Sequence, residues 1–332
     1  MRTLLSRIAV FASAWCACAI HSSSAAGGEL DANEFDRVLN AGGSGESLWE
    51  RGNVEPASAV CAPRSAQCCS RPGTLLRWSY GEGGSGGPDL AEPLVTDRPD
   101  FTEASSTVGV GVAQIEMGYT YVYDSEGDTS VKTHSLGEPL LRYGAFADWF
   151  ELRIALPPMQ ESTTVAGVSD TTTGVADLYL GAKIALTGQE GVLPEMAIVP
   201  QANVPTGTAG FSSESTEPGL NWLYSWEIDD AWSTAGSTQV NRRIDGGSGD
   251  GYAELAQSWT IGRGWSETLA SYAEWFVLVP TGAETEKTEH YVNGGFTYLI
   301  SNDVQFDIRA GKGLTAAADD YFLGTGLSIR YH

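Results

Sequence analysis

YFLGTGLSIRYH, the stretch from Tyr321 to His332, decides the fold. Its odd-numbered positions are mostly apolar, and its even-numbered positions are mostly small or polar. Because successive side chains of an extended strand point to opposite faces, this stretch predicts a β-strand with one apolar face. Segments of the same kind recur back to about residue 112. A bacterial outer-membrane barrel requires this pattern, with lipid on one side of each strand and water on the other.

The segments between residues 112 and 332 are separated by turn signals and number about twelve, an even number as single-chain bacterial barrels require. Short connections such as Ala147-Asp148 alternate with long ones such as Pro158–Gly174, and the loop Asp124–Asp128 ends the first segment. Pro157-Pro158 is expected to break the third strand. The sequence therefore predicts an all-β fold, an antiparallel up-and-down transmembrane β-barrel with periplasmic turns and extracellular loops.

A soluble antiparallel β protein also alternates, so alternation does not say which face is inside. Three observations favour the membrane: an export signal, charges of both signs on the polar face, and tryptophans concentrated near strand ends. These tryptophans are Trp149, Trp222, Trp226, Trp232, Trp259 and Trp275.

The N-terminal part of the chain predicts export. Residues 1–26 combine two arginines, an apolar run from Ile8 to Ile20 and a small-residue site at Ser24-Ala25-Ala26, which is typical of a cleaved signal peptide. The run is shorter than the roughly 20 residues that a spanning helix needs. Residues 27–93 are rich in Gly, Ser, Ala and Pro, and we expect a disordered extension there. The predicted location is the outer membrane.

Charge and cysteine content exclude several classes of function. The formal net charge of −23 argues against nucleic acid as a partner, because phosphate binding needs clustered Lys and Arg. Cys61, Cys68 and Cys69 follow the signal, and the simplest interpretation is one disulfide bridge from Cys61 to Cys68 or Cys69, which leaves a spare thiol. No histidine lies near them, so we expect no metal site, and nothing in the sequence calls for a cofactor.

Charged residues on the polar face of the strands are the candidate lumen lining. They either pair across strands as a structural network or set the selectivity of a channel, as rings of charge do. The candidates are Glu116, Glu138, Arg142, Glu151, Arg153, Asp177, Lys183, Glu195, Glu254, Glu274, Asp307 and Arg309.

Three motifs carry a family resemblance. TDRPDFTE at 96–103, QIEMGY at 114–119 and AADDYF at 317–322 resemble the family named for a putative MetA pathway of phenol degradation. The resemblance covers about Leu94 to His332 and implies an outer-membrane barrel grouped with transporters of aromatic or other organic compounds. Outer-membrane lipid, a small organic solute and, through the C-terminal strand, the barrel assembly machinery are the expected partners. The chain departs from the usual ending on Phe or Trp, because His332 follows Tyr331.

Residues 94–111 precede the barrel and contain the most specific motif. They should lie on the periplasmic side or fold into the lumen. They form either a plug or gate or an entry turn that anchors the chain. The candidate gate residues are Asp97, Arg98, Pro99, Asp100, Phe101 and Glu103.

The sequence does not favour an enzyme. After the signal, the histidines are His134, His290 and His332, and adjacent His134 and Ser135 would point to opposite faces of a strand. No phosphate loop, zinc spacing or calcium loop is present. We therefore expect a passive channel for small organic solutes. The alternative is a non-transporting structural or adhesive barrel, and an open or filled lumen would discriminate the two.

Overall fold

The computed structural model describes residues 74–76 and 88–332. The predicted signal peptide, most of the predicted disordered extension and the three cysteines after the signal lie outside these residues. The described strands are β1 (Ala113–Glu126), β2 (Thr129–Gly144), β3 (Phe150–Ala155), β4 (Pro158–Val165), β5 (Val168–Val175), β6 (Leu178–Thr187), β7 (Glu195–Val204), β8 (Glu217–Glu227), β9 (Trp232–Ile244), β10 (Gly251–Gly264), β11 (Leu269–Thr281), β12 (Glu289–Ser301), β13 (Val304–Gly313) and β14 (Tyr321–Tyr331).

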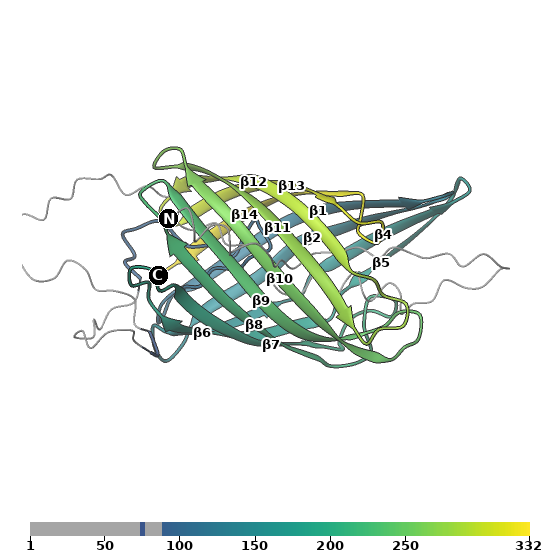
Figure 1. Cartoon of the computed structure of the whole chain (residues 1–332), viewed down its shortest axis with the longest axis horizontal. Coiled ribbons are helices and arrows are strands. Elements are labelled where there is room, and N and C mark those ends of the chain that lie inside the picture. The colour runs from purple at the N-terminus through teal and green to yellow at the C-terminus, as the bar shows by residue number, and fades with distance from the viewer. Residues whose placement is uncertain (1–73, 77–87) are drawn as a thin grey trace, which may run out of the picture.

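The strands form one closed antiparallel barrel (Figure 1). Closure comes from β1, which pairs with β2 on one side and with β14 on the other. β2 pairs with β3 along one half and with β4 along the other, while β3 pairs with β6 and β4 with β5. Because β3 and β4 share one position in the wall, as do β5 and β6, the barrel has twelve strand positions. The predicted fold and strand number are confirmed.

Two details of the prediction were wrong. Pro158–Gly174 is not a long loop but the hairpin of β4 and β5, which projects from one end of the barrel (Figure 1). Its threonines favour a strand, but polar residues on both faces removed the apolar alternation. The second wrong detail is the loop at Asp124–Asp128, which is mostly strand because β1 continues through Glu126. The expected break at Pro157-Pro158 is confirmed, because β3 ends at Ala155 and β4 begins at Pro158. The two strands still share one position in the wall, and Ala176 donates a hydrogen bond to the Pro157 carbonyl at 3.0 Å.

Apolar side chains face outward and polar ones inward. Ile308 on β13 is 45% exposed, whereas its neighbour Asp307 is fully buried. Leu152, Leu180 and Phe306 are likewise exposed. On a water-soluble protein such an apolar surface would be unfavourable, so the outer face fits a lipid environment. Across residues 74–76 and 88–332, no helix is both long and apolar enough to span a membrane.

The two ends of the barrel differ in their connections. Ala113 at the start of β1 pairs with Tyr331 at the end of β14, so the wall begins and ends at one rim. The turns at this rim, such as 228–231 and 302–303, are mostly short, whereas the opposite rim carries the loops 205–216, 245–250 and 282–288. By the rule for bacterial barrels, the rim with short turns is periplasmic.

Candidate functional site: a segment inside the lumen

All twelve candidate lining residues are buried and lie on inward-facing strand positions or at their ends. The segment before the barrel is buried with them, from Thr96 to Val108, apart from half-buried Ser106. We call residues 96–108 the lumenal segment. Its side chains and backbone bind strands around the whole wall, which is possible only if it lies within the lumen.

Asp97 binds one sector of the wall. Its carboxylate accepts hydrogen bonds from Arg153 on β3 and Lys183 on β6, both at 2.6 Å, and lies 3.2 Å from Arg142 on β2. Burial by itself raises the pKa of Asp97, but these three positive charges outweigh it and hold the pKa well below its usual range. Asp97 therefore stays ionised at neutral pH and joins three strands.

Arg98 binds the neighbouring sector, where the barrel closes. Its guanidinium donates to Glu138 at 2.6 Å and lies 3.4 Å from Asp307. It also donates to the Thr325 carbonyl at 3.2 Å. The guanidinium rests against Gly118 of β1 and Gly326 of β14, which face each other across the closing pair of strands. A Cβ at either glycine would collide with it, so the wall holds a seat shaped for Arg98.

The far wall holds the segment through Glu274 on β11. This carboxylate accepts the backbone N–H of Phe101 at 2.8 Å and that of Thr102 at 2.9 Å. The Thr102 hydroxyl donates to it at 2.6 Å. The Pro99 carbonyl accepts a hydrogen bond from Arg309 on β13 at 2.8 Å. Carboxylates that accept several such donors form strong, directional contacts.

The later part of the lumenal segment binds β3, β7 and β8. Glu103 accepts a hydrogen bond from Arg153 at 2.9 Å, and Ser105 donates to Glu195 on β7 at 2.8 Å. The Ser105 hydroxyl lies 2.7 Å from that of Ser225 on β8. Val108 N–H donates to Glu151 at 3.0 Å, after which the chain leaves the lumen and enters β1. These contacts are made by side chains of the wall, so the segment adds no strand to it.

The periplasmic rim ties down the start of the segment. Arg330 on β14 donates to the carbonyls of Leu90 and Glu92 at 3.0 and 2.8 Å and pairs with Asp303. Leu94 N–H donates to the Asn302 carbonyl at 2.6 Å. The chain thus enters the lumen from the periplasmic end, beside the last strand.

An apolar cluster borders the segment inside the barrel. Phe101 stacks on Phe276 with 5.6 Å between ring centroids, and Phe276 stacks on Tyr291 at 4.5 Å. Phe322 and Val122 complete one side of this cluster, and all five residues are buried. The polar-face pattern did not predict an aromatic cluster in the lumen, because each strand supplies only one or two of its members.

Asp177 and Glu254 serve the extracellular half. Asp177 accepts the backbone N–H groups of Thr206, Gly207 and Ser213, which holds the 205–216 loop. Glu254 pairs with Arg243 at 3.2 Å.

The extracellular loops are joined by Asp245. Its carboxylate accepts the Thr285 hydroxyl at 2.5 Å and the N–H groups of Glu284 and Thr285. Burial would raise the pKa of Asp245, but the Thr285 hydroxyl and these backbone donors hold the pKa well below its usual range.

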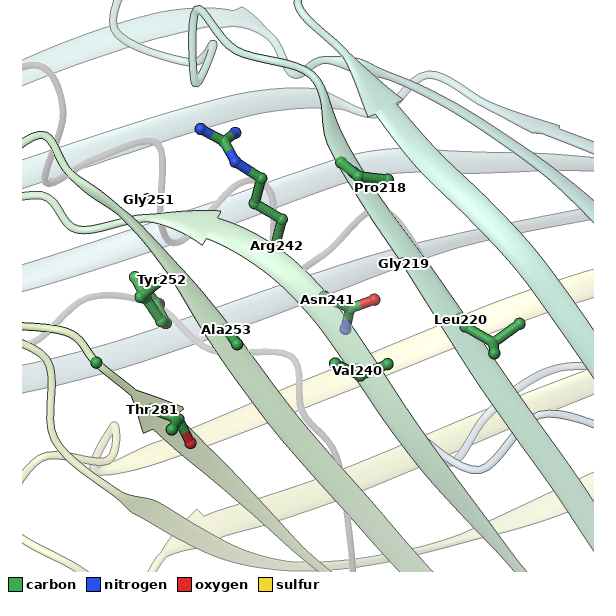
Figure 2. A pocket seen from close by; sticks show the side chains of 11 residues that line it. Pro218, Gly219, Leu220, Val240, Asn241, Arg242, Gly251, Tyr252, Ala253 and Thr281 are labelled. Atoms are coloured by element: carbon green, nitrogen blue, oxygen red, sulfur yellow. The ribbon is translucent and has the colours of Figure 1, made fainter.

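The wall also carries a groove of about 560 Å³ near the extracellular ends of β8 to β10 (Figure 2). Leu220, Val240 and Arg242 line it, and all three are exposed on the lipid-facing side. None of residues 96–108 lines the groove, so it is separate from the lumenal segment.

Sequence reasoning missed several residues of this site. Asn221, which lies 3.4 Å from Glu103, occupies an inward-facing position of β8. The alternation of side chains along that strand could have identified it. Ser105 and Val108 carry no such signal, because they lie in no strand. In residues 74–76 and 88–332, no group of three or more His, Cys, Asp or Glu is placed to hold a metal ion. The side chain of His134, the histidine next to Ser135 in the sequence, contacts a tyrosine: its Nδ1 lies 2.8 Å from the Tyr119 hydroxyl.

Comparisons with known proteins agree with this fold. Residues 96–331 match the model of a family described as "Putative MetA-pathway of phenol degradation". Among solved structures, an outer membrane channel from Pseudomonas putida F1 is similar at 14% identity with a TM-score of 0.55, covering 68% of this chain and 98% of that chain. A comparison with curated proteins found no match.

Two further structures share weaker similarity. The NanC porin has 12% identity and a TM-score of 0.42 over 65% of this chain and 98% of its own. The CymD monoaromatic hydrocarbon channel has 10% identity and a TM-score of 0.36 over 67% of this chain and 89% of its own. The barrel fold, with its apolar outer face, indicates a location in a membrane.

Proposed function

The chain belongs to the family described as "Putative MetA-pathway of phenol degradation", and we propose that it is a passive outer-membrane channel for small organic solutes, aromatic ones included. The observation that carries the proposal is the lumenal segment. It fills a barrel whose wall closes without it, because β1 pairs directly with β14. An occupant that adds no strand to the wall and is held by hydrogen bonds, ion pairs and ring contacts can leave while the barrel stays closed, and its departure opens a path.

The solute class rests on the lining. The aromatic cluster of Phe101, Phe276, Tyr291 and Phe322 gives an apolar solute a surface inside an otherwise charged lumen. Phe101 belongs to the segment itself, so movement of the segment would expose the other three rings. The candidate lining residues then act in two ways, as docking partners of the closed segment and as the charged wall of the open path.

The remaining partners extend this proposal. The export signal within residues 1–26 would be cleaved. The C-terminal strand β14, which ends at Tyr331-His332, would be the part of the chain that the barrel assembly machinery recognises.

A disulfide lock tests the channel and the gate together. The Ser105 and Ser225 hydroxyls lie 2.7 Å apart, so cysteines at both positions can join the segment to β8. The three cysteines after the signal are replaced with serine in this background. Phenylalanine, which crosses bare lipid slowly, is the solute in a liposome-swelling assay. Reduced protein should pass it, and oxidised protein should not.

The control places the disulfide outside the lumen. Cysteines at Ser162 and Thr171, whose hydroxyls lie 2.9 Å apart in the β4–β5 hairpin, should leave permeability unchanged in either redox state. If reduced protein passes no solute, the barrel is not a channel and the structural or adhesive alternative holds. Equal passage by the oxidised and reduced Ser105–Ser225 pair would leave a channel but remove the segment as its gate.

A further inference from the structure

Arg263 lies on the outer wall of the barrel. Ser258 on β10 faces the lumen, where it contacts Thr102, so the period of two places Arg263 on the outer face. It lies next to the short 265–268 turn, at the periplasmic rim, and pairs in register with Trp232 of β9. An arginine here faces the headgroups of the periplasmic leaflet.

Two tryptophans hold the guanidinium. Its Cζ lies 4.1 Å from the centre of the Trp265 ring and 5.0 Å from that of Trp232. The Trp265 indole N–H donates to the Ser271 hydroxyl at 2.8 Å, which fixes the orientation of the Trp265 ring. Cation–π contacts orient the charge without neutralising it. Tryptophan and arginine together are typical of a membrane interface.

Arg263 has no anionic partner in the described part of the chain. No ion pair or hydrogen bond is formed by its guanidinium with residues 74–76 or 88–332, and its Nε is buried without a partner. By contrast, Arg142, Arg153 and Arg243 on other strands each pair with a carboxylate. In a chain with a net charge of −23, an arginine that is held in place yet left without an acid is free to bind an anion from outside the protein.

We propose that Arg263, between Trp232 and Trp265, binds the phosphate of an anionic phospholipid in the periplasmic leaflet. The guanidinium presents several donors in one plane, which suits phosphate oxygens, while the indole rings pack on the glycerol and the upper acyl chains. The site fixes the depth and rotation of one side of the barrel in the membrane. It is independent of the lumen and of any solute.

Brominated lipids test the site through tryptophan fluorescence. Full-length protein is reconstituted in phosphatidylcholine vesicles that contain increasing dibrominated phosphatidylglycerol, and quenching gives the affinity of one lipid relative to the other. The attraction between one basic residue and an anionic lipid at a membrane surface is strong enough for about a fivefold preference for phosphatidylglycerol over phosphatidylcholine. We expect that preference in the unchanged protein, near-equal affinity in Arg263→Gln, and retention of most of it in Arg263→Lys.

The control is Arg242→Gln on the same outer face. Arg242 already donates to the Ser215 hydroxyl at 3.0 Å, and its loss should leave the preference intact. Heat-modifiable migration on gels checks that each variant is folded. The proposal is overturned if Arg263→Gln keeps the full preference. It is equally overturned if Arg242→Gln abolishes it, since the effect would then be general surface charge, or if inorganic phosphate at millimolar concentration removes it by competition.

Discussion

Replacing Arg98 with alanine should shift the lumenal segment from docked to released. The change leaves Glu138 and Asp307 buried without their shared cation. One oxygen of each carboxylate, Oε1 and Oδ1, already has no hydrogen-bond partner among the described residues, so neither group has a ready substitute. Removing one partner of a buried ion pair costs about 3–5 kcal/mol.

This cost sets the size of the effect. Since each 1.4 kcal/mol is a factor of ten, the ratio of released to docked segment should rise by about a hundredfold or more. Single-channel recording in planar bilayers measures that ratio as open probability. Arg98→Lys keeps the charge but loses the planar fork, so it should give an intermediate open probability.

Two further variants make the test specific. Arg242→Ala removes an exposed arginine from the outer face and should leave open probability unchanged. Adding Glu138→Gln and Asp307→Asn to Arg98→Ala removes the two orphaned charges and should restore part of the closed state. If Arg98→Ala is folded but opens no more often than the unchanged protein, the seat at the β1–β14 closure does not hold the segment and the reasoning fails.

Three other outcomes follow from the wall and the loops. Ile308→Arg should make the free energy of folding into lipid vesicles less favourable by about 2–4 kcal/mol, whereas Val168→Arg at the tip of the β4–β5 hairpin should make it less favourable by about 0–1 kcal/mol. Denaturant titrations measure both values, and equal costs would contradict the assignment of Ile308 to the lipid-facing side. Gly326→Ala should raise open probability by pushing Arg98 from its seat, while Gly188→Ala, with open space around it, should not. Asp245 has a lowered pKa, so its stabilisation of the extracellular loops is complete above the unfolded value near 3.9 and is lost as pH falls through the folded value below it. The protection factors of the 284–285 amides against hydrogen exchange, corrected for the intrinsic rate at each pH, should therefore be equal at pH 5 and pH 7, and they should be low at both in Asp245→Ala.

The strands were predictable because each carries its own signal. Period two placed Glu116, Arg142 and Arg153 on the inner face without knowledge of their partners, and all three are buried there. The β4–β5 hairpin escaped because it extends past the apolar band, where both faces are polar and alternation disappears. Where the membrane no longer selects one face, the pattern that identifies a strand is lost.

The site was only half predictable. TDRPDFTE was recognised as a candidate gate, but the choice between an entry turn and a lumenal plug depends on contacts between distant parts of the chain. Arg98 and Asp307, for example, are 209 residues apart in sequence. The facing glycines Gly118 and Gly326 each look like an ordinary small residue on a polar strand face. Their common role as a seat emerges only when β1 and β14 pair.

The arrangement of contacts also predicts how the lumen opens. Asp97 is held by Arg153 on β3, whereas Phe101 and Thr102 are held by Glu274 on β11, six wall positions away in a barrel of twelve. Only three residues separate Asp97 from Phe101, and such a short stretch cannot leave one wall while remaining bound to the opposite one across a clear path. Opening should therefore be a single event. Asp97→Asn and Glu274→Gln should each make the same conductance step more frequent, in planar-bilayer recordings under identical salt. Two distinct conductance levels, one promoted by each variant, would instead show that the two halves of the segment release independently.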